Sequence, residues 1–231
     1  RIIVFVMGDA GSGKDFILEK ARNGLTEFTK LKHNKTHSKS STRKAREDEK
    51  DQNSSRSGTN IITSEEFSQM KANGDFIFDY EYGQKQYGIN QTILLSEAQE
   101  SNILFVPIAL PMRMENSSPI EMVSTLNDTL IDQQTLPLFI SLQNPKKREN
   151  LRNRSESTAQ EIAHRLNMIS TYVDNNPWYR GLINKGWIAE ITSPQDTGIS
   201  SDEGARIFLE AISTQIKKRS HVNLSRQRNN P

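Results

Sequence analysis

Residues 8–15, GDAGSGKD, constrain the fold more than any other part of the chain. They follow an apolar run at residues 2–6 and lead into a helix-forming stretch at residues 16–21. The spacing Gly-x-x-x-x-Gly-Lys between a strand and a helix is typical of a phosphate-binding loop, whose glycines turn backbone N–H groups inward while the lysine meets the β- and γ-phosphates. The motif therefore predicts a nucleoside triphosphate site, and the alternative is a glycine turn that binds no nucleotide.

One position of this loop departs from the usual pattern. Asp15 stands where a serine or threonine normally holds Mg²⁺. Its carboxylate has two alternative roles, because it could approach the metal directly or through water, or could cap the helix that follows. The residues expected at the phosphates are Gly8, Gly11, Ser12, Gly13, Lys14, Asp15 and Phe16.

Composition limits the classes of protein that remain. A chain of 231 residues fits one α/β domain with a smaller inserted domain, or two modest domains. The net charge of +2 provides no global field for nucleic acid or membrane binding, and the absence of cysteine excludes disulfide and thiolate chemistry. No apolar run approaches the roughly 20 residues needed to cross a bilayer. We therefore expect a cytoplasmic location and no membrane partner.

Apolar runs alternate with stretches of helical periodicity along most of the chain. This alternation predicts a parallel sheet covered by helices on both faces, which is a three-layer α/β/α fold. Buried strands are expected at residues 2–6, 103–109, 136–142 and 187–192. Helices are expected at residues 16–21, 146–154, 158–168 and 203–218, with Ser157 as a cap and a frayed tail at 219–231.

The segment between residues 30 and 95 has a different composition. Residues 30–56 carry nine lysines or arginines and almost no apolar side chain, so they predict a long mobile loop that phosphate could partly order. The alternative is a solvated excursion without a role. Residues 64–73 then predict a short capped helix, and the aromatic-rich residues 76–87 predict strands of a small sheet.

The order of these motifs resembles the guanylate kinase group of nucleoside monophosphate kinases. The likeness extends from residue 1 to about residue 215 and lies in four places. They are the phosphate loop, the segment STRKARE at 41–47, the stretch from SEEF at 64–67 through GDFI at 74–77 to Tyr87-Gly88, and the run LRNR at 151–154 followed by Ile162 and Arg165-Leu166.

This resemblance implies a phosphotransferase that uses ATP and Mg²⁺. It implies one domain over residues 1–231, with an acceptor-binding subdomain at 30–95 that includes the basic loop 30–59, and an arginine lid at 146–168. The implied catalytic residues are Lys14, Arg154 and Arg165, and the implied acceptor-binding residues are Arg43, Arg46, Tyr82 and Tyr87. For the two tyrosines, packing in the core or at a sheet edge is the alternative.

The arginines also have a physical explanation of their own. Arg43 and Arg46 are three residues apart, so both guanidinium groups can converge on one phosphate. A solvated run of charge is the alternative. Arg154 and Arg165 fit the lid pattern, where positive charge would stabilise the transferring phosphoryl group, whereas Arg148 could equally be a surface residue, as could Arg152.

Two departures bear on the acceptor. Guanylate kinases bind guanine with a glutamate and an aspartate, and the corresponding positions here hold Phe78 and Ile108, which accept no hydrogen bond. We therefore expect no preference for GMP. The sequence GSGKD at 11–15 and Tyr87-Gly88-Ile89 are more similar to ribose 1,5-bisphosphate phosphokinase, a sugar-phosphate kinase of the same superfamily.

Two hypotheses of different classes follow from the sequence. The first is a P-loop kinase that phosphorylates a small phosphorylated acceptor, either a nucleoside monophosphate or a sugar phosphate such as ribose 1,5-bisphosphate. The second is a catalytically weak module of the same fold that binds nucleotide or a protein partner. Nucleic acid is not an expected partner, because the basic loop lacks aromatic residues for base stacking.

Overall fold

The predicted parallel sheet lies at the centre of the structure. The structure is a computed structural model, and it describes residues 1–8, 12–14, 16–21, 34–36, 39–42, 59–82, 85–109, 119–153, 158–168, 177–193 and 200–228. In this part of the chain the sheet has five strands in the order β2-β7-β1-β8-β9, and all neighbouring strands run parallel. The strands are β2 (Asn34–Thr36), β7 (Ile103–Ala109), β1 (Ile2–Gly8), β8 (Leu136–Gln143) and β9 (Ile188–Thr192).

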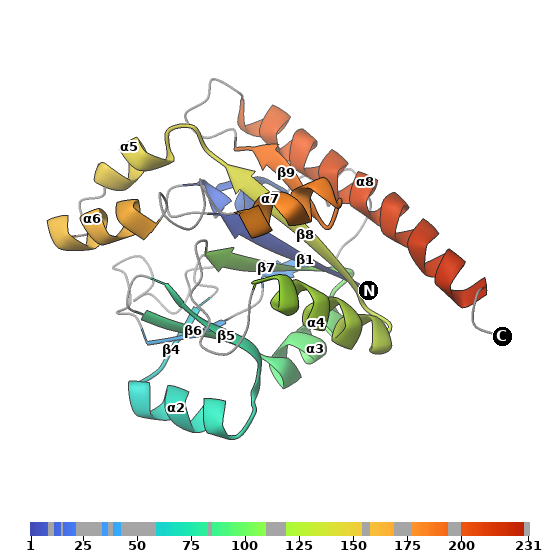
Figure 1. Ribbon diagram of the computed structural model, residues 1–231, viewed down its shortest axis with the longest axis horizontal. Helices are drawn as coiled ribbons and strands as arrows, with labels where there is room; N and C mark the ends of the chain where they lie inside the picture. Colours follow the sequence, from blue (N-terminus) through green and yellow to red (C-terminus); the bar gives the residue numbers. More distant parts are fainter. Residues whose placement is uncertain are drawn as a thin grey trace.

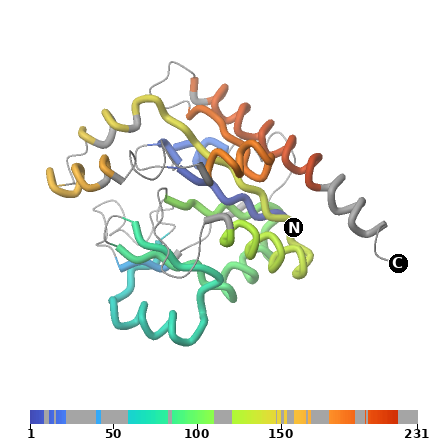
Figure 2. Tube along the Cα trace, in the orientation of Figure 1, coloured from blue at the N-terminus to red at the C-terminus, as the bar shows by residue number. Residues whose placement is uncertain are grey.

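Helices cover both faces of this sheet. Alternate residues of β1 enter two different hydrophobic clusters, with Phe5 in one and Val4 in the other, so both faces are buried. The first cluster includes residues of α3 (Gln91–Glu100), α4 (Pro119–Asp132) and α7 (Pro177–Asn184). The second includes helical residues 17, 18 and 21 and residues of α8 (Ser201–Arg228). The strands lie between α8 and the pair α3 and α4 in Figure 1, and the Cα trace in Figure 2 shows the same layers, so the predicted α/β/α fold is confirmed.

A smaller sheet packs beside the first. Its described strands follow the order β4-β3-β6-β5. Strands β5 and β6 pair antiparallel, and they include the aromatic-rich residues 76–87 for which the sequence predicted strands. A helix, α2 (Ser64–Ala72), begins with a capping box in which Thr63 and Glu66 each accept a hydrogen bond from the other's backbone N–H. The strands are β3 (Lys39–Ser41), β4 (Thr59–Ile61), β5 (Phe76–Tyr82) and β6 (Lys85–Asn90).

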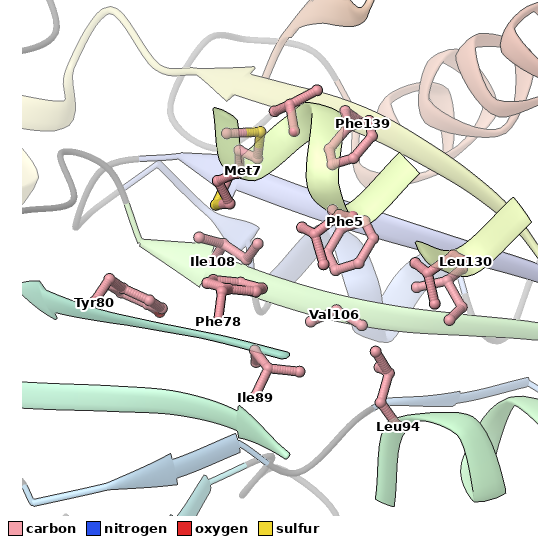
Figure 3. Close-up of a cluster of buried hydrophobic side chains, with 14 of the residues drawn as sticks. Phe5, Met7, Phe78, Tyr80, Ile89, Leu94, Val106, Ile108, Leu130 and Phe139 are labelled. Atoms are coloured by element: carbon pink, nitrogen blue, oxygen red, sulfur yellow. The ribbon is translucent and has the colours of Figure 1, made fainter. Parts of the chain in front are cut away.

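The two faces of the small sheet have different neighbours. Phe78, Tyr80 and Tyr82 alternate along β5 and are buried in the same cluster as Phe5 of the parallel sheet. Figure 3 shows Phe78 and Tyr80 in this cluster beside Ile108 of β7. Asp79 alternates to the opposite face, where its carboxylate pairs with Lys71 of α2 (2.8 Å). The small sheet is therefore held to the parallel sheet by an apolar and aromatic layer.

The structure corrects the prediction of an uninterrupted mobile loop at residues 30–56. β2 adds to the edge of the parallel sheet by pairing with β7, and β3 joins the small sheet beside β6. Edge and surface strands are formed by backbone hydrogen bonds and tolerate polar side chains, so the polar composition was not evidence against a strand. Residues 30–33, 37–38 and 43–56 lie outside the described residues.

The structure also corrects the predicted frayed tail at 219–231. Helix α8 continues past Lys218 to Arg228. The Arg219 guanidinium lies 4.4 Å from the centre of the Trp187 ring and donates a hydrogen bond to Asn127 Oδ1 (3.0 Å), so the first residue of the predicted tail is held to the domain. Residues 229–231 lie outside the described residues. Among the helices that the structure describes, none is long and apolar enough to cross a membrane.

Candidate functional site

The phosphate loop starts at the carboxyl edge of the parallel sheet, where β1 ends. A Cβ atom on Gly8 would lie 2.6 Å from Ser12 Oγ and 3.0 Å from the carbonyl oxygen of Leu142, so this position has no room for a side chain. Gly13 has a φ of 82°, a conformation that favours glycine. The backbone N–H of Ile17 then donates to the Gly13 carbonyl (3.0 Å) and closes the first turn of the helix. The loop thus leads to a helix N-terminus, a favourable place for phosphate.

Lys14 folds back over this loop. Its ammonium group donates hydrogen bonds to the carbonyl oxygen of Gly8 (2.6 Å) and to Oγ of the buried Ser12 (3.3 Å). The cation is therefore held against the backbone that the motif assigns to phosphate binding. Phe16, also predicted at the phosphates, has a 38% exposed side chain. The predicted phosphate ligands Gly11 and Asp15 lie outside the described residues.

The segment that contains the predicted acceptor arginines leaves the small sheet beside Tyr87. At the end of β3, Ser41 pairs in register with Tyr87, and its hydroxyl donates to the Gln86 carbonyl (3.0 Å). The backbone N–H of Thr42 donates to the same carbonyl, and the Gln86 N–H donates to Thr42 Oγ1 (both 3.2 Å). Residue 42 is thus fixed to β6. Arg43 and Arg46 themselves lie outside the described residues.

The two tyrosines predicted at the acceptor are packed in the hydrophobic cluster. Tyr82 is 6% exposed and Tyr87 is 8% exposed, and the Tyr87 ring stacks on Tyr80 with 5.2 Å between ring centres. The structure therefore shows the packing role that the sequence left open for these aromatic residues. Their contact with an acceptor stays a prediction.

The positions that correspond to the guanine-binding carboxylates lie in this same apolar layer. Phe78 is 7% exposed and Ile108 is fully buried, and Figure 3 shows them close together between β5 and β7. Nearby, the Tyr80 hydroxyl accepts a hydrogen bond from the Ala109 N–H (3.4 Å), and burial raises the pKa of this tyrosine well above its ordinary value. These side chains offer no carboxylate to a base.

The predicted arginine lid is a pair of helices beyond the end of β8. They are α5 (Lys147–Arg152) and α6 (Ala159–Met168), which Figure 1 places at the same end of the molecule. Ile162 and Leu166 of α6 pack against the first hydrophobic cluster, so one face of this helix contacts the domain. Arg152 is exposed and Arg148 is partly buried. Arg154 lies outside the described residues; Arg165 lies in α6, although its side chain is not described.

The start of α6 differs from the expectation that Ser157 caps it. Thr158 is the capping residue, because its hydroxyl accepts from the Glu161 N–H (3.2 Å) and the Glu161 carboxylate accepts from the Thr158 N–H (3.1 Å). The two residues form a complete capping box with the Thr-x-x-Glu spacing. The observed cap therefore lies one residue later than predicted, and Glu161 takes the reciprocal role that Gln160 would have had with Ser157.

A polar cluster around the buried Tyr179 and Ser141, beside β8 and β9, was missed by sequence reasoning. The Tyr179 hydroxyl is hydrogen bonded to Ser141 Oγ, accepts from Gln143 Nε2 (2.8 Å) and lies 3.4 Å from a carboxylate oxygen of Glu190. Arg180 donates to the same carboxylate (3.1 Å). The available signal was the polar Ser141 within an otherwise apolar strand, two residues before Gln143. Among the described residues, no group of three histidine or acidic side chains could hold a metal ion.

Comparison with known proteins identifies the fold. In sequence, the chain matches no protein-family profile and no curated protein. In structure, it is similar to guanylate kinase from Anaplasma phagocytophilum, with a TM-score of 0.53 and 14% identity over 92% of this chain and 85% of that chain. The tunicamycin resistance protein of Deinococcus radiodurans aligns over 92% of this chain and 96% of that chain at 11% identity, but its TM-score of 0.36 supports no argument. The chain therefore has a guanylate kinase-like P-loop fold, as its motifs predicted.

Proposed function

We propose that this protein is an ATP-dependent phosphotransferase that acts on a small phosphorylated acceptor. The observation that carries the proposal is the loop from Gly8 to Lys14 at the carboxyl edge of the sheet. Gly8 leaves no room for a side chain, Gly13 makes the left-handed turn, and the Lys14 ammonium lies against the loop backbone. A backbone that leads to a helix N-terminus beside a cation suits a polyphosphate.

The chain's residues would divide the work as follows. Lys14 and the N–H groups of the loop would hold the β- and γ-phosphates. Mg²⁺ would neutralise phosphate charge, and Asp15, the residue next to Lys14 in the sequence, could assist in holding it. Arg43 and Arg46 would hold the acceptor's phosphate. Arg154 and Arg165 would supply charge to the transferring group, since phosphoryl transfer depends mainly on positioning and electrostatic stabilisation.

The proposed reaction is a direct transfer without a covalent enzyme intermediate. An oxygen atom of the acceptor forms a bond to the γ-phosphorus while the bond from that phosphorus to the β,γ-bridging oxygen breaks. The electron pair of the broken bond stays on ADP, and a proton from an attacking hydroxyl group passes to solvent. The lid would exclude water and so favour the acceptor over hydrolysis.

The apolar layer supports an acceptor whose binding does not depend on recognition of guanine. Phe78 and Ile108 are buried where carboxylates would be needed, and Asp79 points to the other face of β5 and pairs with Lys71. Phosphate contacts would then supply most of the acceptor's affinity. Sugar phosphates therefore fit this site at least as well as nucleoside monophosphates.

A second candidate function is a binding module of the same fold. The observation that favours it is the burial of Tyr82 and Tyr87, which pack in the core instead of lining an open surface. In that case the phosphate loop would bind nucleotide without efficient transfer, and a protein partner would take the place of the small acceptor.

A two-stage screen tests the proposal. Thermal unfolding is first measured with nucleoside monophosphates and sugar phosphates, each with and without a non-hydrolysable ATP analogue and Mg²⁺. Compounds that raise the melting temperature are then incubated with ATP, and the phosphorylated product is identified by phosphorus NMR. We expect transfer to at least one of them. Stabilisation by the ATP analogue without transfer to any stabilising compound would favour the binding module.

A further inference from the structure

We propose that Tyr179 is a positioning residue that joins β8 and α7, the elements that precede and follow the α5–α6 lid in the chain, and so sets where the lid stands relative to the phosphate loop. This role rests on the proposed function, because the lid is part of it. The lid helices follow Gln143, the last residue of β8, and the next described element after them is α7, which contains Tyr179. We call Gln143 and Tyr179 the lid anchors.

A direct hydrogen bond connects the lid anchors. Gln143 Nε2 donates to the Tyr179 hydroxyl (2.8 Å), so the two points between which residues 144–178 extend are tied to each other. The backbone of Gln143 is itself fixed, since its carbonyl accepts from the Ser193 N–H (2.7 Å). The next residue, Asn144, accepts from the Lys146 N–H with its side chain (2.8 Å) and turns the chain into α5.

The same hydroxyl is also tied to the strands that begin the phosphate loop. Tyr179 is hydrogen bonded to Ser141 Oγ, and Ser141 pairs in register with Met7, the residue before Gly8. The path from the loop to the lid therefore contains only neighbouring residues. It passes from Met7 to Ser141, then to Tyr179, and then to Gln143.

The polar groups of this cluster satisfy one another. Gln143 Nε2 can only donate, so the Tyr179 hydroxyl accepts from it and keeps its own proton for an acceptor such as Ser141 Oγ or the Glu190 carboxylate, which Arg180 also contacts. Buried polar groups are costly unless paired, and apolar side chains would fill the same space without that cost. Packing alone does not explain why a tyrosine stands at position 179 and a glutamine at position 143. A requirement for one defined arrangement of β8 relative to α7 does explain this pair.

Removal of the hydroxyl group separates this role from packing. The Tyr179 ring lies in the first hydrophobic cluster, so Tyr179→Phe keeps the ring and deletes the bond between the lid anchors. Gln143→Leu deletes the same bond from the other side. Ser141→Ala is the comparison variant, because it removes the bond from Ser141 to the same hydroxyl and a longer contact between Gln143 Nε2 and Ser141 Oγ (3.5 Å), but leaves the anchors joined to each other.

Hydrogen–deuterium exchange of the lid in the free protein tests the proposal. We expect exchange in α5 and α6 to be about three- to tenfold faster in Tyr179→Phe and in Gln143→Leu, as loss of one net hydrogen bond predicts. The double variant should exceed Tyr179→Phe by little, because the bond between the anchors is already absent in that variant. Ser141→Ala should accelerate exchange less than either anchor variant, because the bond between the anchors remains. Equal loosening by Ser141→Ala, or none by Tyr179→Phe, would show that the hydroxyl only attaches α7 to the sheet.

Turnover provides a second measurement that separates this proposal from the proposed function. Tyr179→Phe should lower kcat while leaving the KM for ATP nearly unchanged, because the phosphate loop is intact and only the lid is misplaced. A wild-type protein that neither turns over nor shows protection of the Lys14 region by ADP with Mg²⁺ would contradict the proposed function. The exchange rates of the free variants would still decide whether the anchors hold the lid.

Discussion

The hydroxyl group of Tyr80 on β5 accepts a hydrogen bond from the backbone N–H of Ala109, the last residue of β7 (3.4 Å). This bond joins the small sheet to the parallel sheet at its carboxyl edge, where β1 also opens into the phosphate loop. Tyr80 is fully enclosed and stacks between Phe78 and Tyr87, with ring centres 5.9 and 5.2 Å away. The two sheets are therefore connected by a polar bond inside an aromatic layer.

Alkaline pH should destabilise the protein through Tyr80. Burial, with a smaller contribution from Tyr87, raises the pKa of the Tyr80 hydroxyl well above its ordinary value. Above about pH 10 the unfolded chain releases a proton that the native protein keeps, so the free energy of unfolding falls as pH rises, by up to about 1.4 kcal/mol per unit. Tyr80→Phe should reduce this slope in urea unfolding between about pH 10 and 11 and leave the slope near pH 8 unchanged. Equal slopes for the wild type and Tyr80→Phe above pH 10 would contradict the assignment of this pH dependence to Tyr80.

Lys14→Ala should abolish stabilisation by ATP or ADP with Mg²⁺. A ligand that binds only the native state raises the free energy of unfolding by mass action, by about 2.7 kcal/mol at 100 times its Kd. Thermal unfolding with millimolar nucleotide measures the effect. Lys20→Ala removes the same charge further along the same helix and should retain the nucleotide shift. A wild-type protein that shows no shift would mean that the phosphate loop binds no nucleotide.

Asp15→Ala should distinguish the two roles that the sequence leaves open for this carboxylate. If Asp15 serves the metal, nucleotide stabilisation in the variant should need a higher Mg²⁺ concentration, while stability without nucleotide should change little. If it only caps the helix, the variant should lose about 1 kcal/mol of stability and keep the wild-type dependence on Mg²⁺. A Mg²⁺ titration at fixed ADP concentration, followed by thermal unfolding, separates the two results.

The central fold could be predicted because its signals are local. The apolar runs that form β1, β7 and β8 are buried on both faces, and the glycine spacing at residues 8–13 requires a close approach and a left-handed turn, which the structure shows at Gly8 and Gly13. Composition failed where pairing with distant residues decides the structure. The polar strand β2 forms by pairing with the edge of β7, and Arg219, the first residue of the predicted tail, is held by Trp187 and Asn127.

The candidate site was predicted less completely. Glycines and the lysine at the loop follow a fixed spacing, so they could be found from sequence. The Tyr179 cluster brings together side chains of β8, α7 and β9 whose separation in sequence follows no pattern. Similarly, the burial of Tyr82 depends on how the small sheet packs against the parallel sheet, which no local pattern encodes.

Replacing Arg43 or Arg46 by alanine should weaken the acceptor and spare ATP. Each guanidinium is expected to contact the acceptor's phosphate, so each variant should raise the acceptor's KM, with a lower kcat where the acceptor is misplaced. The KM for ATP should stay near the wild-type value. Arg206→Ala is a suitable control, because this exposed arginine of α8 pairs with Glu203 and Glu210. An equal effect on both substrates would indicate a general loss of charge or folding.

GMP should be a poor acceptor and should compete no better than other phosphorylated molecules of similar charge. Phe78 and Ile108 are buried and apolar, and Asp79 is turned to the other face of β5 in an ion pair with Lys71. A site that makes no hydrogen bonds to a base loses the discrimination that paired buried groups provide, which can reach about 10⁴-fold. Initial rates with GMP, AMP and ribose phosphates at equal concentration measure this preference.

Efficient and selective phosphorylation of GMP would overturn the prediction. That result would require a residue elsewhere that binds the base. Glu81 does not lie in the apolar layer, because it alternates to the same outer face of β5 as Asp79. Carboxylates at residues 47–51, beyond the described part of the chain, would then be the next to test by substitution.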